Sequence, residues 1–272
     1  MIKIIHKVFL LILFIFLENV SAKEIIVFAA ADLVYTLNEV KDLYNQKNPK
    51  DKIKIIYGSS GKGYSQILHG APIDIFFSAN IEYIEKLKEK NLTASEIQIY
   101  AIGRIVLWWK KENKISVKDG IDVLLNPNIK KIAIANWKHA PYGMAAKECL
   151  EFYNIFDRIQ DKLVFGENIS QTAQYIQIGA ADVGIIALSL AKSEFLKKEG
   201  EYSLLPENCH KQIKQAYVIL KHATSNEEKE KIAKRFYDYI QTKESRNIFK
   251  KFGFLLPNEI NNEQNLGNNR RN

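Results

Sequence analysis

The chain has 272 residues, of which 47% are hydrophobic and 26% are charged, and its formal net charge is +8. This composition is that of an ordinary globular protein, and the length suffices for one large or two medium domains. Lysines supply most of the positive charge and are scattered among glutamates. No basic stripe interleaved with aromatic residues is present, so nucleic-acid binding is not indicated.

Residues 1–22 have the pattern of a secretory leader. Lys3 and Lys7 precede an uninterrupted apolar run over residues 8–17, and Val20-Ser21-Ala22 ends the segment with small residues. A basic start, a short apolar core and a small-residue exit are typical of a cleavable signal peptide, and the run is too short for a comfortable membrane span. We therefore expect export to the periplasm.

From residue 25 the chain alternates between short apolar runs, typical of buried strands, and segments with helical spacing. Strands are predicted at 25–28, 53–57 and 74–79, each followed by a helix. Asp32 follows the first strand and is well placed to cap the helix after it. This alternation predicts a parallel sheet with binding loops at the carboxyl ends of its strands.

Gly58-Ser59-Ser60-Gly61 lies where the second strand turns into a helix. Glycines allow backbone N–H groups to point into a concavity, and the helix start and two hydroxyls add donors, which together suit a small oxyanion. A turn that merely requires glycine is equally compatible with this stretch. Gly58 and Gly63 have the separation of a nucleotide-binding P-loop, but Tyr64 stands where the lysine must be, so ATP or GTP binding is not predicted.

A second domain is predicted after Tyr100, where a longer strand at 102–109 crosses into it and a strand at 216–220 crosses back. We expect domain 1 over residues 23–101 and 219–257, domain 2 over residues 102–218, and a disordered, asparagine-rich tail over residues 258–272. The predicted fold is therefore a two-domain α/β protein. Each domain is a mostly parallel sheet flanked by helices, and the ligand cleft lies between the domains.

The two cysteines, Cys149 and Cys209, lie 60 residues apart. Export permits a disulfide, but the sequence leaves open whether the two residues approach closely enough to pair. Neither has metal-ligand spacing to a histidine. We expect both to be structural, and we expect no cofactor.

Several motifs, in order along the chain, resemble the periplasmic molybdate-binding proteins of ABC transporters. They are Val27–Leu33, Gly58–Gly61, Gly70–Ala79, His139–Gly143, Gly166–Gln171, Gly184–Leu188 and Phe252–Phe254. The run Gly-Ala-Pro-x-Asp-x-Phe-x-Ser-Ala is the most specific of them, and the match extends from about residue 24 to 257. The resemblance implies a type II periplasmic-binding fold and a non-enzymatic monomer. Such a protein captures molybdate or tungstate and delivers it to a membrane permease.

The resemblance assigns ligand contacts to Ala31, Asp32, Ser60, Tyr142 and Ile169. Ser60 is expected to offer its hydroxyl and backbone N–H, Ile169 a backbone N–H, and Tyr142 a donor from the second domain. Ala31 and Asp32 match the pair at the start of the first helix. Neutral donors and helix starts can hold a divalent anion without a counter-charge, and no metal cation site is implied.

Two positions depart from the family pattern. Some members carry a tyrosine where this chain has Ala187, and Tyr142 is the candidate to replace that hydroxyl. Asp32 stands where many relatives have serine or asparagine, and a carboxylate should repel a divalent oxyanion in a dry cleft. In the favoured alternative Asp32 turns away to cap the helix. In the other it accepts a hydrogen bond from a protonated anion, which would favour hydrogen phosphate or arsenate.

Two competing functions are compatible with an exported α/β chain. One is a hydrolase that uses Ser60, although no G-x-S-x-G or H-E-x-x-H motif is present and no base for Ser60 is evident. The other is a binding module that feeds a sensor rather than a permease, and the sequence leaves this possibility open.

Overall fold

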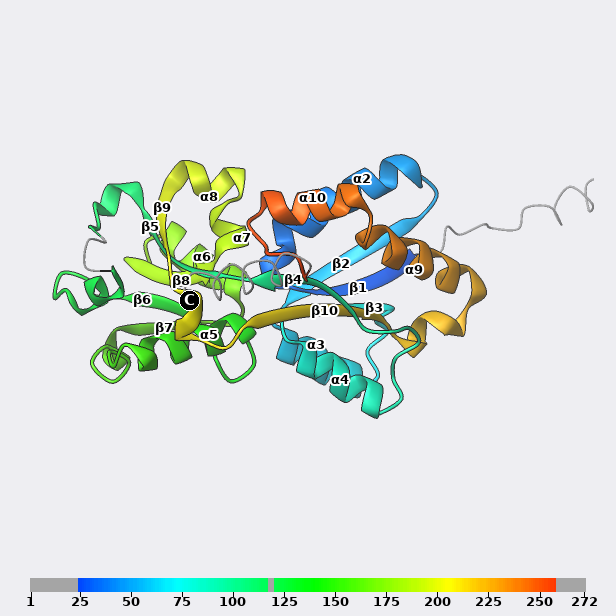
Figure 1. Cartoon of the computed structure of the whole chain (residues 1–272), viewed down its shortest axis with the longest axis horizontal. Coiled ribbons are helices and arrows are strands. Elements are labelled where there is room, and N and C mark those ends of the chain that lie inside the picture. The colour runs from blue at the N-terminus through cyan, green and yellow to red at the C-terminus, as the bar shows by residue number, and fades with distance from the viewer. Residues whose placement is uncertain (1–23, 117–119, 258–272) are drawn as a thin grey trace, which may run out of the picture.

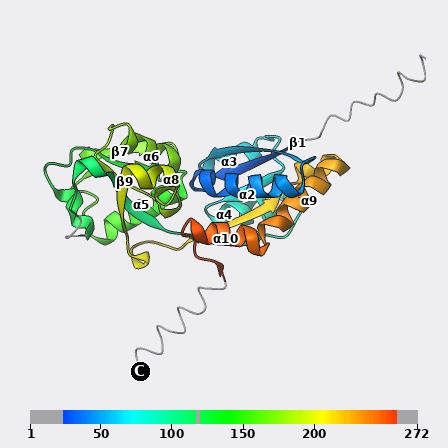
Figure 2. The same cartoon turned by 90° about the horizontal axis from the view of Figure 1, so that it is seen from above.

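A computed structural model describes residues 24–116 and 120–257 of the chain. These residues form two lobes that lie side by side, each built on a five-stranded sheet (Figure 1). Figure 2 shows the same two lobes from above. The expected signal peptide, residues 1–22, and the expected disordered tail, residues 258–272, lie outside the described residues. None of the described helices is long and apolar enough to cross a membrane.

The first lobe is organised around a sheet with the strand order β2-β1-β3-β10-β4. Its strands are β1 (Glu24–Ala30), β2 (Lys52–Gly58), β3 (Ile75–Ser78), β4 (Gln98–Gly103) and β10 (Ile213–Ile219). Its helices are α2 (Val34–Lys47), α3 (Ser60–Leu68), α4 (Ile81–Glu89), α9 (Glu227–Ile240) and α10 (Lys243–Lys251), with 3-10 turns η1 (Ala31–Leu33) and η6 (Lys221–Ser225). In Figure 1, α2 and α10 lie on one face of this sheet, and α3 and α4 lie on the other.

Alternation along the buried strands explains how helices cover both faces of the first sheet. Successive side chains of a strand point to opposite faces. Val27 and Phe77 therefore pack in the core that includes residues of α2, α9 and α10, whereas Phe28 and Phe76 pack in the core that includes residues of α3 and α4. These strands read as continuous apolar runs because both faces are buried.

The second lobe is organised around a sheet with the strand order β7-β6-β8-β5-β9. Its strands are β5 (Ile105–Lys110), β6 (Ile132–Ala135), β7 (Leu163–Gly166), β8 (Val183–Ala187) and β9 (Gly200–Leu204). Its helices are α5 (Pro141–Phe152), α6 (Ile169–Gln177), α7 (Leu188–Ala191) and α8 (Glu194–Glu199), with 3-10 turns η2 (Lys111–Asn113), η3 (Gly120–Leu125), η4 (Gln160–Lys162) and η5 (Glu207–Cys209).

Both sheets are mixed, whereas mostly parallel sheets were expected. In the first lobe β1 is parallel to β2 and β3, but β10 is antiparallel to β3 and β4. In the second lobe β6 is parallel to β7 and β8, but β5 is antiparallel to β8 and β9. The antiparallel pairs all involve β5 or β10, the strands that follow the two crossings between lobes. A strand that enters from the other lobe is not bound to the direction that strand–helix–strand units impose.

The crossings lie at Arg104, between β4 and β5, and at residues 205–212, between β9 and β10. Both β4 and β10 belong to the first sheet, so residues 102–103 and 213–218 lie in the first lobe and not in the second as expected. The apolar pattern locates these strands but does not reveal which sheet a strand joins. The Arg104 guanidinium donates hydrogen bonds to the Gly253 carbonyl at 2.7 and 3.1 Å, so the end of the described chain is fastened to the first crossing.

Cys149 and Cys209 form a disulfide, with Cα atoms 4.5 Å apart. Cys149 lies in α5, and Cys209 lies in η5, just before the second crossing. Both residues are buried. The bond therefore resolves the pairing that the sequence left open and ties α5 to the segment that returns to the first lobe.

The double variant Cys149→Ala/Cys209→Ala is expected to lose about 4 kcal/mol of unfolding free energy. The bond closes a loop over a separation of 60 residues, and loop-closure entropy for that length gives roughly this value. Urea unfolding of the oxidised wild type and the double variant measures the difference. A reductant should lower the stability of the wild type and leave the variant unchanged. Equal stabilities would contradict a stabilising bond.

Candidate functional site

A small cavity lies where the two lobes meet. Its volume is about 10 Å³, room for about one water-sized group. It is lined by Ala30, Ala31, Asp32, Gly58, Ser59, Ser60 and Ala79 from the first lobe and by Ala140, Pro141, Tyr142 and Ile169 from the second. An ion with four oxygens therefore fits only if the lobes stand further apart than they do here.

The structure brings together all five residues that the sequence assigns to the ligand. Ala31, Asp32 and Ser60 line the cavity from the first lobe, and Tyr142 and Ile169 line it from the second. All five are buried. Their contact with a ligand remains a prediction. In this structure the Tyr142 hydroxyl, which was expected to donate to the ligand, donates to Asp32 instead.

Helix starts from both lobes point at this cavity. Helix α3 begins at Ser60, α5 at Pro141 and α6 at Ile169. The first N–H groups of a helix have no partner within the helix, and they carry partial positive charge. At α6 the Asn168 side chain accepts hydrogen bonds from the second and third N–H groups of the helix. The Ile169 N–H is thus left for another acceptor, and an anion suits that position.

Ser60 contributes two donors at the start of α3. Its side-chain oxygen accepts a hydrogen bond from the Ala79 N–H at 2.9 Å, and both groups are buried. This contact uses an acceptor position of the hydroxyl, so the hydroxyl proton can be donated to a group in the cavity. The Ser60 N–H is the first of its helix and is the second donor.

Asp32 places a buried carboxyl in the cavity wall. Its Oδ2 accepts hydrogen bonds from the Tyr142 hydroxyl and from the Gln215 amide, both at 2.9 Å. Its Oδ1 is buried and has no hydrogen-bond partner among the described residues. Burial raises the pKa of Asp32 to about 7, although the hydrogen bonds from Gln215 and Tyr142 oppose the rise.

The favoured expectation that Asp32 caps a helix is wrong. Residues 31–33 form the 3-10 turn η1, so Asp32 lies inside a helical turn and not in front of one. Helix α2 starts after Leu33 without a side-chain cap. The carboxyl group points instead toward the second lobe and meets Tyr142.

Gln215 and Tyr100 belong to the site although the sequence did not single them out. The Tyr100 hydroxyl donates to the Gln215 Oε1, which turns the amide NH₂ toward Asp32 and Tyr142. The amide donates to the Tyr142 oxygen at 2.8 Å. A polar Gln215 beside the apolar run 216–220 was the available signal, because such a residue in a buried strand needs partners.

The rim of the cavity holds further contacts between the lobes. The Gly61 N–H donates to the His139 carbonyl at 2.9 Å, and the Ser59 hydroxyl lies 2.8 Å from the His139 Nδ1. Lys62 and Glu167 form an exposed ion pair across the same rim. A Cβ at Gly61 would lie 2.6 Å from the His139 oxygen, so glycine is required for this close approach.

These rim residues do not form a catalytic triad. Glu167 Oε2 lies 3.8 Å from the His139 Nε2 and pairs with Lys62, so it does not hold the imidazole as the acid of a triad does. Ser59 and His139 belong to different lobes, so their contact depends on how the lobes are placed. No base among the described residues hydrogen-bonds to Ser60, the nucleophile of the hydrolase hypothesis.

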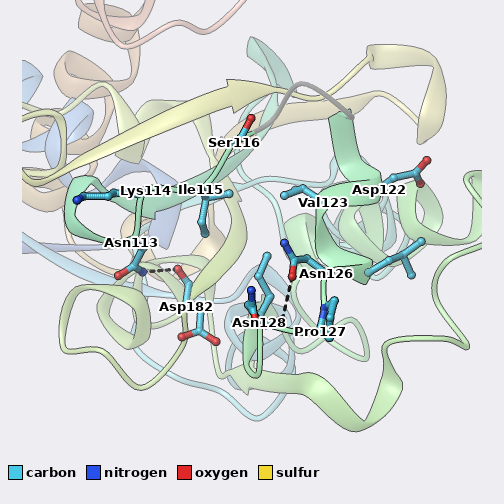
Figure 3. Close-up of a pocket in the computed structure, with 12 residues that line it drawn as sticks. Asn113, Lys114, Ile115, Ser116, Asp122, Val123, Asn126, Pro127, Asn128 and Asp182 are labelled. Atoms are coloured by element: carbon cyan, nitrogen blue, oxygen red, sulfur yellow. Dashed lines mark hydrogen bonds between the residues drawn. The ribbon is translucent and has the colours of Figure 1, made fainter.

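A larger cavity of about 780 Å³ lies in the second lobe and includes none of the predicted site residues (Figure 3). The Asn113 amide there donates to the Asp182 carbonyl at 2.7 Å. The Asp182 carboxylate accepts from the N–H groups of Lys130 and Lys131. These polar groups are already paired, so we assign no function to this cavity.

Two α/β lobes, two crossings between them and a cavity between the lobes that is lined by helix starts define a solute-binding protein. The model of the family described as bacterial extracellular solute-binding protein matches residues 25–255, and the chain belongs to that family.

Several individual proteins of known or suggested function are similar to this chain. The chain is 31% identical to the molybdate-binding protein ModA of Rhodobacter capsulatus over 237 residues, which cover 86% of this chain and 89% of that protein. It is 29% identical to the putative ABC transporter substrate-binding lipoprotein YvgL of Bacillus subtilis, with 83% of this chain and 84% of that protein covered. The solved structure of the Azotobacter vinelandii periplasmic molybdate-binding protein matches with a TM-score of 0.78 and 31% identity, and the match covers 86% of this chain and 99% of that one.

These findings confirm the expected two-lobed periplasmic-binding fold and the expected family. A member of this family is a transport component, so the chain is a binding protein and not an enzyme.

Gly103→Ala is expected to disturb the hydrogen bonds that join Asp32, Tyr142 and Gln215. A Cβ at this position would lie 2.3 Å from the Tyr142 hydroxyl oxygen and 2.6 Å from the Gln215 Nε2. Displacing these groups should lower the unfolding free energy by about 1–3 kcal/mol, as overpacking of a core does. Chemical denaturation measures the change. An unchanged stability would contradict the close packing of Tyr142 and Gln215 against Gly103.

Proposed function

We propose that the protein captures molybdate in the cleft between its lobes and delivers it to an ABC permease in the membrane. Tungstate, which has the same shape and charge, is the expected second ligand. Two observations together support this proposal. Helix starts and neutral donors from both lobes surround one small cavity, and relatives at 31% identity over most of the chain are molybdate-binding proteins.

The physical basis of binding is the replacement of water by fixed donors. A divalent oxyanion that leaves water loses strong hydration, so each of its oxygens must find a donor in the closed cleft. The Ser60 hydroxyl and N–H and the Ile169 N–H can supply donors from opposite lobes. The described lining includes no lysine or arginine, so helix starts must supply the positive potential.

Binding and closure are one process in this proposal. The ligand enters an open cleft, and donors from the second lobe reach it only when the lobes approach. The crossings at Arg104 and residues 205–212 are the segments about which the lobes can rotate. The loaded, closed form is the form that the permease receives. We propose that the chain acts as a monomer, exported to the periplasm by a signal peptide that is then removed.

The alternative ligand is a tetrahedral oxyanion that carries its own proton, such as hydrogen phosphate or arsenate. The observation that favours it is the unpartnered Oδ1 of Asp32 in the cavity wall. This oxygen could accept a hydrogen bond from the ligand, as the sequence already suggested.

Calorimetry with molybdate, tungstate, sulfate and phosphate in parallel decides between these ligands. We expect one molybdate or tungstate ion to bind per chain, and we expect sulfate and phosphate to bind far more weakly. Binding of phosphate without molybdate would assign the cleft to the alternative ligand. Binding of none of the four ions would refute an oxyanion site.

Ser60→Ala is expected to weaken molybdate binding by roughly 10- to 100-fold, because a hydrogen bond to a charged group contributes about 1.5–3 kcal/mol. Ser65→Ala is the matched control, since Ser65 lies in the same helix and is exposed. Calorimetry measures the affinity of each variant. Thermal melting measures how much stability Ser60→Ala loses, because the Ala79 N–H no longer has the Ser60 oxygen as its acceptor. Equal affinities of the two variants would exclude Ser60 from the site.

A further inference from the structure

We infer that the cleft binds its oxyanion together with one proton, which is shared between Asp32 Oδ1 and the ligand. Asp32 is then a specificity-determining residue that acts as a hydrogen-bond donor in its neutral form. The inference rests on the proposed function, because it requires an oxyanion in the cavity.

The geometry of the carboxyl group leaves one oxygen for the ligand. Asp32 has no exposed surface and lines the cavity. Its Oδ2 already accepts two hydrogen bonds, from Tyr142 and from Gln215, whereas its Oδ1 accepts none from the described residues. A buried polar oxygen without a partner is costly, so a group that binds in the cavity is expected to satisfy it.

The hydrogen-bond donors around Asp32 have no proton left for a ligand, so an ionised Asp32 does not suit an anion. Tyr142 has one hydroxyl proton, and it is donated to Asp32. The two amide protons of Gln215 go to Asp32 and to the Tyr142 oxygen. With Asp32 ionised, the Tyr142 hydroxyl and the Gln215 amide are both committed, and the ligand would face a bare negative oxygen. A proton on Oδ1 converts the same atom into a donor without moving any other group.

The groups that face Asp32 offer no compensating charge. They are Tyr142 from α5, Gln215 from β10 and, through Gln215, Tyr100 from β4. The Ser189 hydroxyl from α7 donates to the Asp32 main-chain oxygen at 2.8 Å. Burial raises the pKa of both tyrosines well above its usual value, so they stay neutral. Burial between the closed lobes also raises the pKa of Asp32 to about 7, so part of the closed, empty form carries the proton at neutral pH.

The proton has two possible sources, and they follow from the ligand. Molybdate, tungstate and sulfate carry no proton near neutral pH, so the proton must come from solvent and bind with the ion. Hydrogen phosphate brings its own proton and can donate it to Oδ1. In both cases the bound state contains one proton between two oxygens, and no covalent bond forms or breaks.

Calorimetry of molybdate binding in two buffers with different ionisation enthalpies measures the proton directly. For the wild type we expect uptake to rise toward one proton per ion at about pH 8.5, and we expect Kd to increase about tenfold per pH unit above about pH 7. Below that pH the affinity should level off, because Asp32 is already neutral. Molybdate binding without proton uptake and without this pH dependence would overturn the inference.

Asp32→Asn separates the proton from other effects of the carboxyl group. Its amide N–H is a permanent donor, so the variant should bind molybdate with an affinity that no longer changes with pH and that exceeds the wild-type affinity at about pH 8.5. Asp42→Asn, an exposed position in α2, is the control and should keep the wild-type pH profile. A folded Asp32→Asn variant that keeps the wild-type pH profile would contradict a role for Asp32.

The phosphate arm distinguishes a failure of the inference from a failure of the proposed function. One possible result at about pH 8.5 is that phosphate binds without proton uptake and molybdate does not bind. This result would replace molybdate by phosphate as the ligand of the cleft, and it would support the shared proton. Binding of neither ion at any pH would refute both the proposed function and the inference.

Discussion

Closing the cleft removes water from every polar group in its wall, and this cost governs how the site is built. Most of these groups have a partner when the lobes meet. The Ala79 N–H has the Ser60 oxygen, the Gly61 N–H has the His139 carbonyl, and Asp32 Oδ2 has Tyr142. Among the described residues Asp32 Oδ1 has no partner, and the first N–H groups of α3 and α6 have none within their helices. The cavity is therefore incomplete without a ligand that accepts hydrogen bonds from the helix starts and shares a proton with Asp32 Oδ1.

The protein's positive charge and its binding site are separate features. The net charge of +8 arises from lysines on the surface, whereas the ionisable side chains that line the cavity are the carboxyl group of Asp32 and the phenol of Tyr142. Selectivity for an anion must then come from backbone dipoles, hydroxyl groups and protonation. In such a site the direction of each donor, rather than an opposite charge, positions the ligand.

Local patterns in the sequence predicted the alternating strands and helices, and the family motifs predicted five of the eleven residues that line the cavity. These predictions succeed because strand ends, glycines and helix starts are encoded within a few residues. The orientation of Asp32, the role of Gln215 and the membership of β10 in the first sheet were missed. Each depends on a partner more than 100 residues away in sequence, or on a strand's choice between two sheets. The pairing of Cys149 with Cys209 stayed open because their spacing does not show whether their Cα atoms lie close enough for a disulfide.

The disulfide also has a mechanical consequence for the moving parts. It fastens α5, which carries Tyr142, to η5, which leads directly into the second crossing. A rotation at that crossing would therefore also displace α5, because the disulfide joins the two segments. The segment before the second crossing and the helix that carries Tyr142 are thus covalently one unit. Reduction of the bond would allow the second crossing to move independently of α5 and Tyr142.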